Sequence, residues 1–144
     1  MANEMPDPNS YSGLKRKVLQ YSVAFAEIVE RLKAGAAPET VWAPFEELID
    51  VEAFTREGVF AGAEAEVIGW DTYKSYISKY SGNTAWEGTL RHITEEPGRV
   101  ILELEERNSH DGRTHVSNTV TIYEFNEAEK LRHLDVYVMP LRWQ

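Results

Sequence analysis

The sequence contains no cysteine, and its basic residues are in the minority, with 15 Lys and Arg against 24 Asp and Glu. The lack of cysteine excludes disulfide bonds and thiolate chemistry and favours a reducing, cytoplasmic location. The formal net charge of −9 counts against nucleic acids and anionic membranes as partners. No apolar run approaches the roughly 18 residues of a membrane-spanning helix, and the start, MANEMPDP, does not resemble a signal peptide.

Length and composition predict a single domain. A chain of 144 residues, of which 42% are hydrophobic and 27% charged, contains enough apolar material for one core. Residues 1–13 contain two Pro, two Asn, two Ser and one Gly, so we expect them to form a flexible arm. Residues 14–144 are expected to form the domain.

Three helices are predicted in the first 80 residues. Between residues 14 and 32, apolar residues recur at alternating steps of four and three, which is the spacing of an amphipathic helix. This stripe consists of Leu14, Val18, Tyr21, Phe25, Ile28 and Leu32. A second helix over 38–49 is broken or kinked by Pro44. A third, rich in aromatic residues, begins at Asp71 as its N-terminal cap.

The remaining sequence predicts strands, because apolar residues there recur with a period of two. Four strands are expected at 86–94, 99–108, 113–125 and 131–139. Their short connections indicate an antiparallel meander. Before them, residues 54–60 predict a short strand and residues 62–69 a turn-rich connection. The fold class is therefore α+β, with three N-terminal helices packed on a curved antiparallel meander sheet.

The order of the elements carries a resemblance to a known family. A long helix is followed by a short helix, a strand at 53–60, and a helix that begins Gly-Trp-Asp-Thr-Tyr at 69–73. The last strands contain Tyr-Glu-Phe-Asn at 123–126 and His-Leu-Asp-Val-Tyr at 133–137. In these features residues 12–140 resemble the NTF2-like superfamily, which includes ketosteroid isomerases, SnoaL-type polyketide cyclases, limonene epoxide hydrolases and scytalone dehydratases. The resemblance implies a cone, in which a bent sheet surrounds the long helix and a pocket lies at the open end.

The resemblance places a carboxylate, Glu57, where ketosteroid isomerases have their general base. The positions of their two oxyanion donors carry Ile28 and Thr121, and loss of one such donor costs about 10²–10³-fold in rate. Steroid isomerisation is therefore disfavoured. The last-strand acid of the epoxide hydrolases falls at Val136, and Asp135 should face outward because strand side chains alternate. A slip of one residue would instead turn Asp135 into the cavity.

A candidate site follows for the inner face of the sheet. Glu57 is the predicted proton-transfer base, and His115 with Glu106 is the predicted acid partner. The alternative is that His115 and Glu106 lie at the rim of the cone, exposed to water, and have no catalytic role. The predicted substrate-binding residues are Tyr21, Phe25, Tyr73, Leu104, Thr121, Tyr123, Val136 and Val138. No metal site and no cofactor are expected.

Two functions remain open at this point. The first is a SnoaL-like enzyme, namely a cofactor-independent isomerase, cyclase, dehydratase or epoxide hydrolase that acts by proton transfer on a small, hydrophobic, oxygenated ligand. The second is a non-catalytic NTF2-like module for ligand binding or dimerisation, because one fold supports many functions.

The outer face of the predicted sheet indicates a homodimer. If the inner face of the strand at 113–125 carries the polar set, its outer face carries Val116, Asn118, Val120 and Ile122. Ile101 and Tyr137 extend this apolar surface on other strands. Exposed patches of this kind favour association, so we expect a two-fold dimer that packs two outer sheet faces together.

Overall fold

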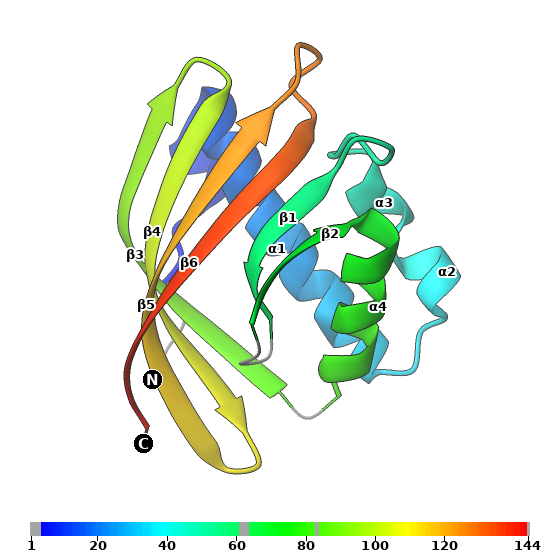
Figure 1. Cartoon of the computed structure of the whole chain (residues 1–144), viewed down its shortest axis with the longest axis vertical. Helices are drawn as coiled ribbons and strands as arrows, with labels where there is room; N and C mark the ends of the chain where they lie inside the picture. Colours follow the sequence, from blue (N-terminus) through cyan, green and yellow to red (C-terminus); the bar gives the residue numbers. More distant parts are fainter. Residues whose placement is uncertain (1–3, 61–63, 83, 144) are drawn as a thin grey trace.

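The structure is a computed structural model that describes residues 4–60, 64–82 and 84–143. It has the predicted α+β class, with a six-stranded sheet that curves around the helices (Figure 1). The elements are η1 (Pro8–Ser10), α1 (Gly13–Lys33), α2 (Pro38–Val41), α3 (Ala43–Glu46), β1 (Thr55–Val59), β2 (Ala65–Gly69), α4 (Trp70–Tyr80), β3 (Thr84–Glu96), β4 (Arg99–His110), β5 (Arg113–Phe125) and β6 (Leu131–Trp143).

The predicted long helix is confirmed as α1. Leu14, Val18, Tyr21 and Ile28 of its apolar stripe are buried in the core, because the spacing of the stripe places them on one side of the helix. After the helix, Gly35 adopts φ +89°, a left-handed conformation that glycine reaches without steric cost. In the view of Figure 1, α1 passes behind the sheet, while α2, α3 and α4 lie beside β1 and β2.

The segment between α1 and α4 differs from the prediction in two places. The second helix is two single turns, α2 and α3, because Pro44 stands in the first turn of α3 and cannot continue the preceding one. The predicted connection at 62–69 contains a strand, β2, which pairs antiparallel with β1. Residues 61–63 lie outside the described part of the chain.

The strand order is β2-β1-β6-β5-β4-β3. The predicted meander is confirmed for β3 to β6, but the sheet is mixed, because β1 pairs parallel with β6. This seam depends on Gly58, which has φ +149° and lies opposite Val136. A Cβ atom at Gly58 would lie 2.6 Å from the Val136 carbonyl oxygen, so only glycine lets the two backbones approach so closely.

The N-terminal segment lies against the sheet from Glu4 onward. The Glu4 backbone N–H donates to the Gly88 carbonyl at 2.8 Å, and Met5 packs against the core. Among the described residues, no helix combines the length and apolar character needed to cross a membrane.

Candidate functional site

The interior of the cone contains a continuous group of aromatic rings. Phe45 is fully buried at its centre, with ring centroids 4.4 Å from Tyr21 and 5.4 Å from Trp70. The aromatic cluster consists of Tyr21, Phe25, Trp42, Phe45, Phe54, Phe60, Trp70, Tyr73, Tyr76 and Tyr123. Because α1, α3, α4 and β5 all contribute rings, the cluster joins the helices to the concave face of the sheet.

Arg56 of β1 points into this apolar interior and is only 7% exposed. Its guanidinium carbon lies 5.2 Å from the Phe60 ring centroid and 5.3 Å from that of Tyr73. One Nη donates to the Val59 carbonyl at 3.2 Å, while the Nε atom has no hydrogen-bond partner. No carboxylate of the described residues forms an ion pair with Arg56. A buried charge without a counterion is costly, and the Tyr73 hydroxyl is a polar neighbour of the guanidinium.

Three tyrosines lie in the same part of the interior. Burial raises the pKa of Tyr21 well above its usual range, and the neighbouring Tyr73 and Tyr123 raise it further. Burial also raises the pKa of Tyr73, against the influence of Arg56, and that of Tyr123. The hydroxyl of Tyr21 is buried and lies beside the Tyr73 hydroxyl. The tyrosines therefore stay neutral at ordinary pH and offer O–H donors to a bound oxygen atom.

Glu106 of β4 supplies an acid close to these tyrosines. Its strand neighbours Leu102 and Leu104 are buried on the inner face, and alternation places Glu106 on that face as well. The Glu106 carboxylate accepts a hydrogen bond from Trp86 Nε1 at 2.5 Å and acts electrostatically on Tyr73 and Tyr123. We call Tyr21, Arg56, Tyr73, Glu106 and Tyr123 the interior polar cluster.

The structure brings part of the predicted site together. Tyr21, Tyr73, Leu104 and Tyr123 are buried in one core, and Phe25 and Val136 pack against it. Thr121 is half-buried, opposite Leu102 and Val136. Val138 lies beyond this region and is 44% exposed.

The predicted relation between His115 and Glu106 is diagonal across two strands. His115 pairs with Asn108, and Glu106 pairs with Ser117. His115 is half-buried and lies close to the turn that joins β4 to β5.

The predicted orientation of Glu57 is wrong. Glu57 is exposed on the outer face of the sheet, and the neighbouring Arg56 occupies the inner face. The sequence contained a signal for this, because Phe54 and Phe60 share the parity of residue 56, and large aromatic side chains belong to the apolar face of a half-buried strand. Glu57 is therefore not brought together with His115 and Tyr123.

Glu57 instead meets two residues of β6. The predicted outward orientation of Asp135 is confirmed, since Asp135 pairs with Glu57 across the parallel seam. His133 Nε2 lies 2.8 Å from an Asp135 carboxylate oxygen, and His133 Nδ1 lies 2.6 Å from Thr55 Oγ1. Ligand atoms of Glu57, His133 and Asp135 all lie within 4.8 Å of one another. We call these three residues the outer-face cluster.

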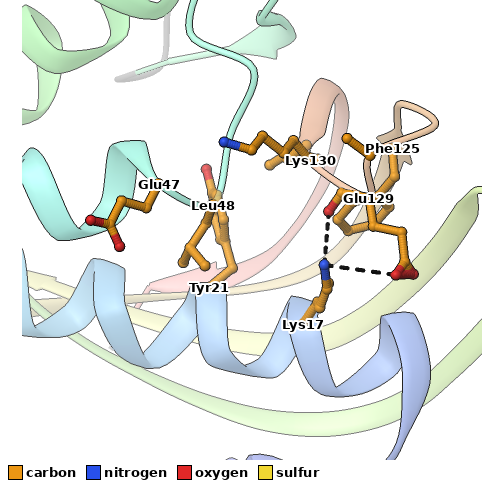
Figure 2. Close-up of a pocket in the computed structure, with 9 residues that line it drawn as sticks. Lys17, Tyr21, Glu47, Leu48, Phe125, Glu129 and Lys130 are labelled. Carbon is orange, nitrogen blue, oxygen red and sulfur yellow. Dashed lines mark hydrogen bonds and ion pairs between the residues drawn. The ribbon is translucent and has the colours of Figure 1, made fainter.

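Two hollows in the described surface lie away from the predicted pocket. The first, of about 110 Å³, lies between α1 and the β5–β6 turn, and Tyr21 is part of its wall. Figure 2 shows Lys17 at its edge, where the amino group donates to the Glu129 carbonyl at 3.1 Å. The second, of about 430 Å³, is a surface depression beside the start of α4. Neither includes Glu57, His115 or Tyr123.

Comparisons with known proteins identify the fold through structure alone. No family model matches the sequence, and no curated protein matches it either. An NTF2-like protein from Anabaena variabilis superposes with a TM-score of 0.60 and 14% identity, over 89% of this chain and 93% of the other. An LEH-like epoxide hydrolase from M. tuberculosis gives a TM-score of 0.53 and 10% identity, over 81% and 83% of the two chains.

A designed protein has the same architecture. A computationally designed 17-OHP binder superposes with a TM-score of 0.55 and 16% identity, over 78% of this chain and 92% of the other. Both natural and designed neighbours thus share the helices on a curved sheet described above. The chain has the fold of the NTF2-like proteins.

Proposed function

We propose that the chain binds a small, hydrophobic, anionic molecule inside the cone and acts on it by proton transfer, as a SnoaL-like enzyme. The observation that carries this proposal is Arg56, a guanidinium that is 7% exposed and has no carboxylate partner among the described residues. The buried hydroxyl of Tyr21, which lies beside that of Tyr73, adds a donor to the same interior. A carboxylate or enolate oxygen of the ligand accepts hydrogen bonds from both groups, while the aromatic cluster encloses the apolar part of the ligand.

The interior polar cluster has the parts that proton transfer requires. Glu106 is the proposed proton-transfer group in place of Glu57, because it lies on the inner face near the tyrosines. Arg56 and the hydroxyl of Tyr73 are the proposed stabilisers of the negative charge that develops on the substrate oxygen. Structural similarity to an LEH-like epoxide hydrolase and to a designed small-molecule binder supports a ligand in this interior.

Replacement of Arg56 by Met is expected to weaken ligand binding while preserving the fold. The binding of a panel of hydrophobic carboxylic acids, and of their methyl esters as uncharged controls, is followed by tryptophan fluorescence. A charged hydrogen bond contributes about 1.5–3 kcal/mol, so Arg56→Met should weaken binding of the acid by roughly 10–150-fold. The same variant should unfold at an equal or higher temperature than the wild type, since it removes an uncompensated buried charge.

The exposed Arg31 of α1 provides the matched control, because Arg31→Met removes the same charge from the surface. Equal weakening in both variants, or equal affinity for acids and esters, contradicts the proposed role of Arg56.

Catalysis is tested separately from binding. In D2O, the wild type should introduce deuterium next to the carbonyl group of a bound keto acid, and Glu106→Gln should bind the acid without exchange. Binding without exchange in the wild type favours the second function, a non-catalytic ligand-binding module.

The outer sheet face supports a proposed homodimer. Val59, Val67, Tyr137 and Met139 are 37%, 63%, 60% and 56% exposed, and we call them the outer-face patch. Ile122 and Val120 are half-buried beside it, whereas Val116, which the sequence placed in this surface, is fully buried next to a bulge of β5. The occupant that we propose for the patch is a second copy of the chain.

Tyr137→Asp is expected to convert a dimer into a monomer of 16.5 kDa. Sedimentation velocity at micromolar concentration measures the change, because a charge in the centre of an apolar interface is strongly unfavourable. Val23→Asp is the control, since Val23 is 46% exposed on α1, away from the outer sheet face. A wild-type monomer, or a Tyr137→Asp dimer, contradicts the proposed interface.

A further inference from the structure

The outer-face cluster combines an imidazole with two carboxylates at the seam between β1 and β6. Parallel pairing places Glu57 directly opposite Asp135, and alternation places His133 on the same face as Asp135. One ligand atom from each of these residues lies within 4.8 Å of the others. We propose that Glu57, His133 and Asp135 bind a divalent transition-metal ion.

The hydrogen bonds of His133 match those of a metal-binding histidine. With bonds of about 2.0–2.2 Å, neighbouring ligand atoms lie about 2.8–3.1 Å apart around an octahedral ion and about 3.3–3.6 Å apart around a tetrahedral ion such as Zn²⁺. His133 Nε2 and the nearest Asp135 oxygen are already 2.8 Å apart. An ion between them replaces the Nε2 proton, and the two atoms need to move little.

Thr55 completes the orientation of His133. Its hydroxyl lies 2.6 Å from Nδ1, and a hydroxyl either donates or accepts. When Nε2 binds a metal, Nδ1 carries the proton and donates it to Thr55 Oγ1. Hydrogen bonding of the second ring nitrogen is the usual way in which a protein fixes a histidine ligand.

The donor set selects the class of ion. One imidazole nitrogen with two carboxylates suits Zn²⁺, Co²⁺ or Mn²⁺, whereas Ca²⁺ and Mg²⁺ prefer oxygen ligands alone. The two carboxylates of the site supply its negative charge, because the neighbouring Glu124, opposite His133 on β5, is already paired with Arg132 at 2.8 Å. Glu57 is exposed in the single chain, and one of its carboxylate oxygens already lies within 4.8 Å of the other two ligand atoms, so that water completes the coordination.

A metal ion at this position would hold two strands of the sheet together. Its ligands lie on both sides of the only parallel strand pair among the described residues, so a bound ion links β1 directly to β6. A ligand that binds the folded state alone stabilises that state, and Zn²⁺ should therefore raise the unfolding temperature.

Titration of the untagged, metal-free full chain with Co²⁺ and Zn²⁺ tests the site. We expect one equivalent to bind, visible as a Co²⁺ absorption band that Zn²⁺ removes and as a rise in Tm. His133→Gln, Asp135→Asn and Glu57→Gln should each weaken binding by more than about tenfold, and Thr55→Val by about tenfold. Glu57→Gln changes only an exposed side chain, so its fold is unaffected and its result is interpretable.

A second His–Asp pair on the chain provides the matched control. His110 Nε2 lies 3.1 Å from Asp111 on the exposed β4–β5 turn, and no third ligand joins them among the residues that the structure describes. The double variant His110→Gln/Asp111→Asn should keep wild-type affinity and the Tm response. The proposal is overturned if no stoichiometric binding occurs, or if the His110 variant loses binding while the Glu57 and His133 variants retain it.

Discussion

Phe45→Ala is expected to lower the free energy of unfolding by about 3–5 kcal/mol, as other large truncations of buried phenylalanines do. Phe45 is fully buried. Its ring lies 4.4 Å from Tyr21, 5.4 Å from Trp70 and 5.9 Å from Trp42, measured between centroids. Its loss leaves a cavity that rigid neighbouring rings fill poorly, because aromatic side chains have few alternative rotamers. Urea denaturation measures the change.

Phe25 is the matched control for this prediction. It belongs to the same aromatic cluster but is half-buried, so Phe25→Ala removes less contact and leaves a site that water can enter. We expect a clearly smaller loss of stability from Phe25→Ala. Equal losses in the two variants contradict the central position of Phe45 in the core.

The free energy of unfolding should fall steeply as the pH rises above 10. The pKa values of Tyr21, Tyr73 and Tyr123 are raised by burial from the ordinary value of 10.0. Above that pH the unfolded chain loses these protons while the folded chain keeps them, so rising pH favours unfolding. Below it, both states are neutral and the effect vanishes. Each tyrosine that stays protonated in the folded chain and ionised in the unfolded chain lowers the free energy of unfolding by about 1.4 kcal/mol per pH unit.

Urea denaturation between pH 9 and pH 11.5, with tyrosinate absorbance as a second readout, checks this dependence. Tyr123→Phe should reduce the slope, because the unfolded chain then has one proton fewer to lose in this range. An unchanged slope in Tyr123→Phe, or tyrosinate formation by all three residues in the folded chain, contradicts the buried arrangement.

Patterns that extend over many residues predicted the fold well. The stripe from Leu14 to Leu32 determined α1, and the period of two after residue 85 determined β3 to β6. The short turns between β3, β4, β5 and β6 predicted antiparallel pairing, because a short connection is visible in the local sequence. The parallel pairing of β1 with β6 was not predicted, because it joins segments far apart in sequence and no local signal specifies it.

The candidate site was harder to predict, because it depends on which of two neighbouring residues in a strand faces the interior of the cone. In the short strand β1, Arg56 and Glu57 are both charged, so local polarity does not tell which one faces inward. The matching to the ketosteroid isomerases favoured Glu57, while the aromatic residues at 54 and 60 favoured Arg56. For the longer β5, the buried Tyr123 was placed correctly, but a bulge after Val116 altered the alternation near the strand's start.

The place of β6 in the sheet has a consequence for how the chain reaches its folded state. β6 lies between β1 and β5 although it is the last strand to be synthesised. Before residues 131–143 leave the ribosome, the β1–β2 hairpin has no neighbour and β5 has an open edge. Unpaired strand edges associate readily with other chains. A nascent chain therefore carries two edges prone to aggregation, and the arrival of a single late segment covers both of them at once.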